Sequence, residues 1–379
     1  MEKYSAFRDP GTGIQPFLTP VPPKQTLTIL NIFQPVGIIL GLARVILVLI
    51  LTLVYTLTVH GVFFIFTPVP PLYRFATRFA TAVVTRLVLL VSGFWWIHVE
   101  SANRKRGRGD VAEKWNPGSG DIIVSNCVSW VELLWLAFRF DPVFVVPVTS
   151  PAIDNLPSGP LVGKRTTSRQ SSSSFDKSST ASSHVDRSEI LGFTTLSLLQ
   201  MIHVAGHVPP YLGHAKAPKT LEEIRQKAKR PIVIFPECTT SNGRGLLRFA
   251  EVFKSETVPV VRYKLFLMCV RIDPPTKWSP SIAIPIPSGG VINPLLHLFK
   301  LSSSFAPHTL VIRLLAQSES PSTGTFVVSD VIKDTLTTDD VLSEVCATLI
   351  SNAGRMKRLG LRWEDKAKFL EFYATKKYA

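Results

Sequence analysis

The sequence predicts an α/β fold in which a mostly parallel sheet is covered by helices, preceded by a membrane helix or helical hairpin. From Trp95 onward, short apolar runs alternate with helical patterns, which is typical of a parallel sheet with helical crossovers. Residues 45–66 form an apolar run without Asp, Glu, Lys or Arg. A chain of 379 residues has room for one large α/β domain and additional segments.

The apolar run at 45–66 predicts a membrane segment. A helix of about 22 residues is long enough to cross a hydrocarbon layer of roughly 30 Å. The run starts too far from the N-terminus for a cleaved signal peptide. A second apolar stretch, 79–97, contains Arg86, whose charge is costly inside a membrane. We therefore expect either a hairpin of two spans or one span followed by a domain helix.

Four segments follow from composition. Residues 1–35 are rich in Pro and Gly and are expected to be irregular. Residues 36–97 are the anchor and 98–335 the main domain, in which the Ser-rich stretch 165–188 is predicted to be a disordered insertion. Residues 336–379 should be helical. Basic residues near the anchor favour a cytosolic main domain.

The elements of the main domain follow from apolar patterning. Strands are expected in the runs DIIVSN (121–126), FVVPV (144–148), MIHVAG (201–206), PIVIFPE (231–237), VPVVRY (258–263) and TLVIRLLA (309–316). Helices are expected near 130–139, 190–200 and 220–229. The end of the chain predicts an amphipathic helix with Trp363, Ala367, Leu370 and Tyr373 on one face and lysines elsewhere.

The charge balance favours an anionic partner. The 42 Lys and Arg against 27 Asp and Glu give a net charge of +15, which suits phospholipid or nucleic acid. A mean hydropathy of +0.23 favours membrane lipid, and no aromatic and basic residues interleave on a common face as nucleic-acid binding needs. The four cysteines lack CxxC spacing, so we expect reduced thiols in the cytosol, with neither disulfides nor a metal site.

The most specific motif is IVIFPECTTSNGRGLLRF, residues 232–249, where a buried strand runs into a polar turn containing an arginine. It resembles the FPEGTxSNGR block of the PlsC-like glycerolipid acyltransferases. The following VPVVRYK, with Pro259, is similar to that family's later VPV block. The family's first block, N-H-x4-D, corresponds to NCVSWVE, with Asn126, Cys127 and Glu132 at its three defined positions.

The resemblance covers about residues 90–315, and the opening MEKYSAFRDPGTGIQPFL resembles the start of fungal lysophosphatidate:oleoyl-CoA acyltransferases of the endoplasmic reticulum and lipid droplet. It implies the PlsC-like acyltransferase fold for 98–335 and acyl transfer from acyl-CoA to a lysophospholipid, above all lysophosphatidate to phosphatidate. Acyl-CoA would be a co-substrate, and no other cofactor is implied. The main domain would face the cytosol from the endoplasmic reticulum or a lipid droplet.

Cys127 stands where the family has the histidine that removes the proton from the acceptor hydroxyl. A thiol of pKa about 8.5 is a better nucleophile than base at pH 7, although a helix start can lower that pKa. Three roles remain open: base, carrier of the acyl group as a thioester, or a residue that only shapes the site. In the last case Glu132 or the substrate phosphate handles the proton.

Glu132 stands where the family has the aspartate that orients the histidine, and we predict it as the second catalytic residue. The alternative is structural, because Ser129 and Glu132 fit the capping box S-x-x-E. On one continuous helix, residues five apart point about 140° from each other. Cys127 and Glu132 can converge only if Cys127 precedes the helix, where backbone N–H groups could also stabilise an oxyanion.

The second block supplies the predicted substrate-binding residues. Arg244 would bind the lysophosphatidate phosphate, with a solvated loop arginine as the alternative. Gly243 and Gly245 would allow close backbone approach. Glu237 would orient the glycerol hydroxyl or hold the loop. The remaining polar residues of this turn, Thr239, Ser241 and Asn242, would donate to phosphate or build the turn.

Two further features leave the function open. The family's intermediate block ends in an arginine, and the corresponding stretch here has His203, His207 and His214 instead; core histidines are the expected explanation, with His207 the best candidate for chemistry. The rival function is a non-catalytic lipid-binding or membrane-trafficking protein that keeps the fold and has lost the base. The sequence NCVSWVE favours that rival, and the intact run from Phe235 to Arg244 speaks against it.

Overall fold

The computed structural model describes residues 4–22, 28–102, 113, 115–149, 188–210, 217–254, 256–276, 278–288, 292–332 and 339–378. Residues 165–187 of the predicted Ser-rich insertion lie outside these ranges. The four cysteines are buried thiols that form no disulfide.

The described part of the chain contains a mostly parallel sheet of seven strands, in the order β1-β8-β7-β2-β5-β3-β4. The central strands β7, β2, β5 and β3 run parallel, whereas β8 and β4 pair antiparallel to their neighbours in that group. This confirms the predicted α/β class. The strands are β1 (Ile97–Ala102), β2 (Ile122–Ser125), β3 (Val143–Thr149), β4 (Ile190–Leu196), β5 (Ile232–Ile234), β7 (Leu265–Ile272) and β8 (Leu310–Leu315).

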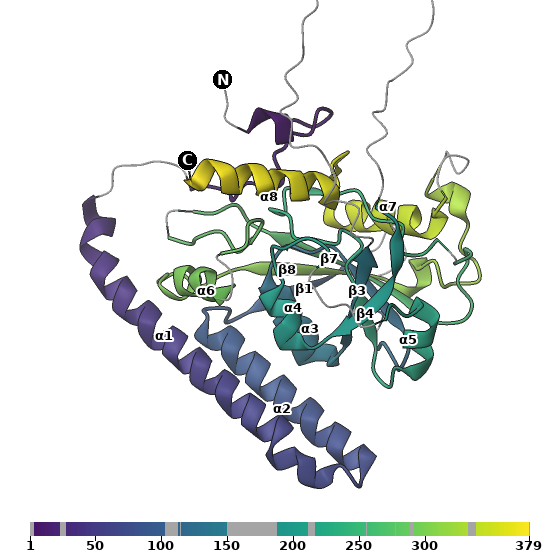
Figure 1. Ribbon diagram of the computed structural model, residues 1–379, viewed down its shortest axis with the longest axis horizontal. Helices are drawn as coiled ribbons and strands as arrows, with labels where there is room; N and C mark the ends of the chain where they lie inside the picture. The colour runs from purple at the N-terminus through teal and green to yellow at the C-terminus, as the bar shows by residue number, and fades with distance from the viewer. Residues whose placement is uncertain are drawn as a thin grey trace, which may run out of the picture.

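Helices cover both faces of the sheet (Figure 1). On β2, Ile123 faces one apolar cluster while Ile122 and Val124 face the other, because side chains alternate along a strand. The first cluster includes α2 (Pro70–Val91), α3 (Trp130–Phe140), α4 (Leu198–His203) and α6 (Leu295–Ser302). The second includes α5 (Leu221–Lys227) and α7 (Val341–Gly354). The central parallel strands are buried on both sides.

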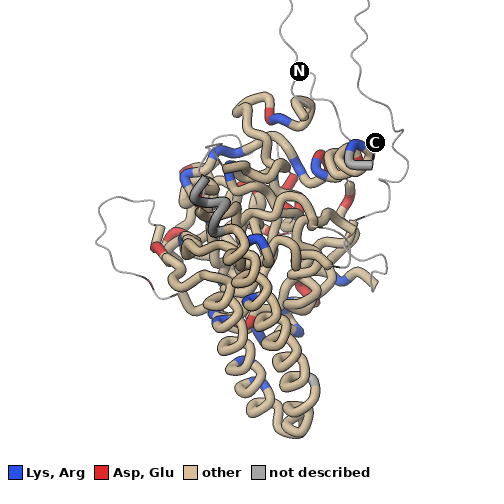
Figure 2. Tube along the Cα trace, turned by 90° about the vertical axis from the view of Figure 1, so that its left-hand side faces the viewer, with Lys and Arg blue, Asp and Glu red and all other residues tan. Residues whose placement is uncertain are grey.

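Helix α1 (Thr28–His60) and α2 form a hairpin that extends away from the domain, and most of its residues are uncharged (Figures 1 and 2). Among the described residues one stretch, Gln34–Phe66, is long and apolar enough to cross a membrane. Helix α2 packs on both α1 and α3, so it is at once the hairpin partner and a domain helix. Arg86 folds back, and its guanidinium donates to Phe94 O and Trp95 O.

The first half of α1 is docked on the domain. Gly41 lies so close to α6 that a Cβ there would stand 2.9 Å from Ser303 Cβ and 3.1 Å from Phe299 Cε2. Arg44 Nη1 donates to Ser302 O and Ser304 O at 2.9 and 3.0 Å. A small residue permits close helix contact, and the guanidinium satisfies carbonyls at the end of α6.

The two ends of the chain pack together (Figure 1). Phe17, 1% exposed, and Phe369 of α8 (Trp363–Tyr378), 0% exposed, share an apolar cluster with Leu247 and Leu359. Asp9 Oδ1 accepts from Gly360 N at 2.8 Å. Residues 4–22 contain one short 3-10 helix, η1 (Ser5–Phe7), and the N-terminal segment is built into the domain. Helix α1 begins at Thr28, inside the stretch 1–35 that was expected to be irregular.

Three predicted elements are wrong. The stretch 190–200 was expected to be a helix, but Ile190–Leu196 is strand β4, and the expected strand 201–206 continues helix α4 into a turn. The capping box of Ser197 and Gln200 fixes the change from strand to helix. The run 258–263 is not a strand; β7 begins at Leu265.

The apolar stretch 79–97, whose structure the sequence left open, is divided between two elements, since α2 ends at Val91 and β1 begins at Ile97.

Candidate functional site

Cys127 lies in the turn between β2 and α3, as the strand-turn-helix pattern predicted. Asn126 fixes this turn, because its side chain continues the β2–β7 pairing: Nδ2 donates to Val270 O at 2.9 Å and Oδ1 accepts from Val270 N at 2.7 Å. Ser129 caps α3. Cys127 therefore precedes the helix, so its side chain and that of Glu132 can converge.

Glu132 is fully buried in the first turn of α3. Its Oε1 accepts from Val128 N at 2.6 Å, so the structural role of a capping carboxylate is present. Its Oε2 is buried and has no hydrogen-bond partner among the described residues. Burial raises the pKa of Glu132 to about 8. The side chain thus combines a structural contact with one unused acceptor next to Cys127.

Glu237 joins the two predicted blocks. It is fully buried, and its two carboxylate oxygens accept from Cys127 N at 2.7 Å and from Leu247 N at 2.8 Å. Ser241 N donates to Cys127 O at 3.0 Å. Burial raises the pKa of Glu237 to about 8, and the two backbone N–H groups oppose that rise. The predicted role of holding the loop is therefore present in the structure.

The other polar residues of this loop are buried and hydrogen-bonded to the protein. Thr239 Oγ1 donates to His207 O at 2.8 Å. Ser241 Oγ accepts from Gly243 N at 3.3 Å. Asn242 Nδ2 donates to Gln15 O and Leu18 O at 2.6 and 3.1 Å. Each of these side chains builds the loop or attaches the N-terminal segment to it.

Arg244 is the exposed member of the predicted set. Among the described residues, no ion pair or side-chain hydrogen bond holds its guanidinium. Gly243 adopts a φ of +71°, and a Cβ there would stand 2.8 Å from Ile272 Cγ1. Gly245 is equally close to Leu359. Packing within the protein thus requires glycine at the two positions that flank Arg244, independently of any approach to a ligand.

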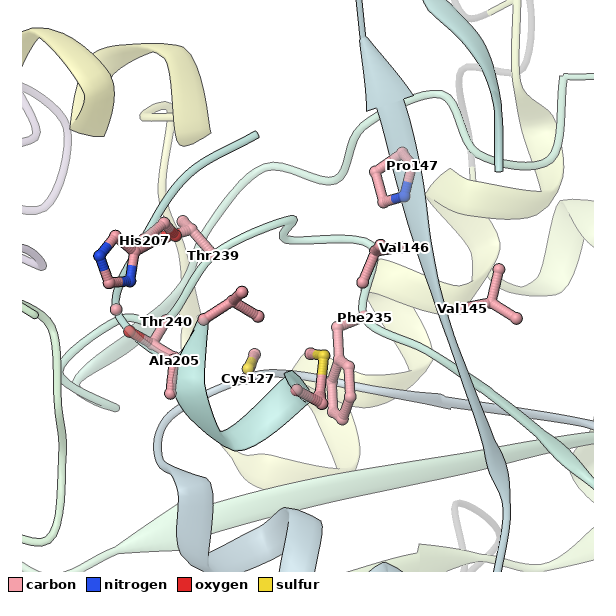
Figure 3. A pocket seen from close by; sticks show the side chains of 12 residues that line it. Cys127, Val145, Val146, Pro147, Ala205, His207, Phe235, Thr239 and Thr240 are labelled. Carbon is pink, nitrogen blue, oxygen red and sulfur yellow. Dashed lines mark hydrogen bonds between the residues drawn. The ribbon is translucent and has the colours of Figure 1, made fainter. Parts of the chain in front are cut away.

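A small cavity of ≈ 20 Å³ adjoins Cys127 (Figure 3). Its walls come from β3, α4, the turn after α4 and the Phe235–Thr240 stretch, and they include Met201, His207, Phe235, Thr239 and Thr240. This volume suffices for about one water molecule. Cys127 is 4% exposed, so the thiol borders an opening that is too narrow for an acyl chain.

The electrostatic surroundings of Cys127 differ from the expectation of a lowered pKa. Burial raises the pKa of the thiol well above its usual value, and Glu132 and Glu237 raise it further. The same two carboxylates occupy the N–H groups of Cys127 and Val128. The helix-start hypothesis required these N–H groups to stabilise an oxyanion. Because the carboxylates occupy them, they are not available for that role.

Lys366 is a site residue that the sequence analysis missed. It lies on α8 and is fully buried, with Nζ donating to Thr239 Oγ1 and Thr240 O, both at 2.7 Å. The prediction that the lysines of this helix point away from its apolar face is wrong for this residue. The sequence signal for the burial of Lys366 is its position three residues after Trp363, because residues three apart share a helix face.

Of the three histidines in the predicted intermediate block, His207 borders the cavity. Its Nδ1 is buried without a hydrogen-bond partner among the described residues, and burial lowers the pKa of His207. Figure 3 shows its ring beside Thr239, at the far side of the cavity from Phe235. His203 stacks against it, and His214 lies outside the described residues.

A larger cavity of ≈ 850 Å³ lies at the C-terminal end of α3. Arg86, Trp96, Trp135, Phe138 and Arg139 are among its lining residues. No predicted site residue borders it, whereas Cys127 and Thr239 border the smaller cavity.

No protein-family model, curated protein sequence or solved structure matches this chain. The fold defines a class, an α/β protein with a mostly parallel sheet and an N-terminal helix long and apolar enough to cross a membrane, and the assignment of a function to its site is a proposal.

Proposed function

We propose that this protein transfers an acyl chain from acyl-CoA to the free hydroxyl of a lysophospholipid. Lysophosphatidate is the proposed acceptor and phosphatidate the product. The acceptor oxygen attacks the thioester carbonyl, the carbon–sulfur bond breaks, and the hydroxyl proton ends on the CoA thiolate.

One observation carries the proposal. The two segments that resemble the acyltransferase blocks are 110 residues apart, and they meet through Glu237 and through the Ser241–Cys127 backbone hydrogen bond. Buried acidic groups with strongly shifted pKa values gather at that junction, which is typical of functional sites. Arg244 stands exposed at the end of the same loop, where a guanidinium suits a phosphate group.

Glu132 is the proposed acceptor of the hydroxyl proton. A carboxylate whose pKa is raised to about 8 is a far stronger base than an ordinary glutamate, and a base works best when its pKa is near the working pH. The raised pKa of the Cys127 thiol argues against a thiolate base. Cys127 in this proposal shapes the cavity, which must widen before an acceptor hydroxyl can reach Glu132.

The apolar hairpin would place the site at a membrane surface. Both substrates are amphiphiles that partition into lipid, and the stretch Gln34–Phe66 has the length and composition of a span. We propose a cytosol-facing domain on the endoplasmic reticulum or lipid droplets.

The test is an assay of the purified full-length chain in liposomes with labelled oleoyl-CoA and a panel of lysophospholipids. We expect labelled phosphatidate from lysophosphatidate and less product from acceptors without a phosphomonoester. Arg244→Ala should raise KM for lysophosphatidate, whereas Arg248→Ala, an exposed arginine nearby, should not. A folded protein that labels no acceptor would refute the proposal.

A second candidate is a non-catalytic lipid-binding protein. It is favoured by the narrow cavity and by the protonated state that the raised pKa implies for the Cys127 thiol. This candidate predicts binding of lysophosphatidate to liposome-embedded protein without acyl transfer, and loss of that binding in Arg244→Ala.

A further inference from the structure

The buried lysine of the C-terminal helix has an unusual environment. The buried face of α8 is mostly apolar, with Trp363 and Phe369 among the most deeply buried side chains of the protein, and Glu364 is its other buried charged residue. Lys366 Nζ is held by neutral oxygens: Thr239 Oγ1, Thr240 O and, at 3.3 Å, Thr240 Oγ1. Among the described residues no carboxylate lies within 4 Å of it. A buried ammonium without an ion pair is costly.

The two threonines that hold Lys366 also line the cavity beside Cys127. Thr239 and Thr240 therefore contact both the ammonium and the cavity. Cys127 and Glu237 act on this charge, since both raise the pKa of Lys366 against the opposing effect of burial. The ammonium is thus bound to the loop that joins the two blocks.

We propose that Lys366 is a positioning residue of the candidate site, whose buried ammonium, held by the Thr239–Thr240 loop, stabilises negative charge on Cys127 and Glu237 when these groups ionise. The C-terminal helix is then part of the site. The inference rests on the proposed function in one respect only, namely which reaction the charge of Lys366 serves.

Lys366 itself titrates, and so do several groups around it. Burial lowers the pKa of Lys366 to about 7, so its charge is present below about pH 7 and declines at higher pH. The titratable groups around this part of the structure are Cys127 and Glu132 at the β2–α3 junction, Glu237 and Cys238 after β5, His207 after α4, and Glu364 on α8 itself. Of these, Cys127 allows direct and site-resolved detection.

The test measures the rate at which methyl methanethiosulfonate modifies Cys127 from pH 6 to pH 9, read by mass spectrometry of the Cys127 peptide. Loss of a nearby cation raises a thiol pKa by roughly one unit or more. Lys366→Met should therefore slow modification about tenfold below pH 7, and the difference should shrink toward pH 9. Lys368→Met, on a more exposed position of the same helix, is the matched control and should follow the parent.

A pH-independent change in Lys366→Met, or no change, would overturn the inference and leave Lys366 with a packing role. If Lys366→Met shows no cooperative thermal transition, Lys366→Arg decides the matter. A guanidinium keeps its charge at pH 9, so Cys127 should react faster there than in the parent; an identical rate would also overturn the inference.

The modification assay does not depend on acyl transfer. A protein without acyltransferase activity in which Lys366→Met still shows the pH-dependent effect would refute the proposed function and leave the electrostatic role intact. Acyl transfer by the parent, together with a pH profile of Cys127 modification that is the same in the parent and the variants, would support the proposed function and refute the electrostatic role of Lys366.

Discussion

Cys127 occupies the position at which the resembling family has a histidine, and its surroundings explain why a histidine would not fit. The thiol is 4% exposed and borders a cavity of ≈ 20 Å³. We predict that Cys127→Ala retains acyl transfer within about tenfold, because a residue that shapes the site is not the proton acceptor. Cys127→His should lose thermal stability, since overpacking costs about 1–3 kcal/mol.

Thermal unfolding and initial rates of transfer test both variants. A hydroxylamine-sensitive acyl adduct on the parent protein that is lost in Cys127→Ala would contradict this assignment, because it would identify Cys127 as the acyl carrier.

Glu132 should control the pH dependence of the reaction. Its pKa is raised to about 8, so the basic form accumulates as the pH rises, and kcat/KM should increase between about pH 6.5 and 8.5. Glu132→Gln should lower kcat/KM by about 10²- to 10⁴-fold, the usual effect of general-base catalysis. The apparent pKa of this pH–rate profile belongs to Glu132 and Glu237 together, since both carboxyl groups titrate in this range.

The same raised pKa affects stability with a definite sign. Folding disfavours the Glu132 carboxylate, so this contribution is fully present below about pH 4.5 and is lost as the pH rises toward 8. The thermal midpoint of the parent should therefore fall relative to that of Glu132→Gln across this window. If the thermal midpoints of the parent and of Glu132→Gln changed in parallel with pH, the raised pKa of Glu132 would be contradicted.

Cys238 takes the place of the glycine in the resembling FPEGT block and adopts a φ of +53°. A non-glycine residue in this left-handed region costs about 1–2 kcal/mol, and the buried thiol offsets part of that by packing. We predict that Cys238→Gly stays within about 1 kcal/mol of the parent, while Cys238→Val, β-branched at a positive φ, is destabilised by more than about 2 kcal/mol.

Chemical denaturation in detergent measures both changes. Cys346→Val in helix α7 provides the matched control, because that cysteine is equally buried on an ordinary helical backbone. Equal losses for the two valine variants would show that the backbone of Cys238 is not strained.

At the level of elements, the contact between α1 and α6 determines whether the hairpin is a flexible tether or a fixed part of the domain. Gly41→Leu would place a side chain where Ser303 and Phe299 now lie, and should destabilise the protein by about 1–3 kcal/mol. Ile46→Phe adds bulk on the same helix at a 56% exposed position and should be tolerated. Thermal unfolding in detergent compares them, and equal midpoints would indicate that α1 is not docked.

The elements that carry the predicted chemistry could be derived from the sequence because strong local signals bound them. An apolar run followed by a polar turn located β2 before Cys127 and β5 before Pro236. Around Ser197 the local signal was weak, and strand and helix were predicted in the wrong order. The apolar pattern of 190–206 fits either structure. The capping pair Ser197–Gln200 was the better indicator of where the helix begins.

At the level of the whole molecule, the site depends on contacts that no local pattern reveals. The N-terminal segment anchors Asn242, and the C-terminal helix brings Lys366 behind the same loop. The spacing of Lys366 from Trp363 is compatible with the buried face of α8, although the lysines were expected on the other faces, and only the folded chain shows which loop that face meets. The occupation of the Cys127 and Val128 N–H groups by carboxylates was equally beyond sequence analysis, because it requires the position of Glu237.

The most direct measurement is a single-turnover experiment with the folded protein in excess over labelled acyl-CoA and with lysophosphatidate present. The account predicts that the label leaves CoA and appears in phosphatidate, and that Glu132→Gln slows this step by at least about a hundredfold. Label that remains on CoA, while the protein is folded and binds lysophosphatidate, would contradict it.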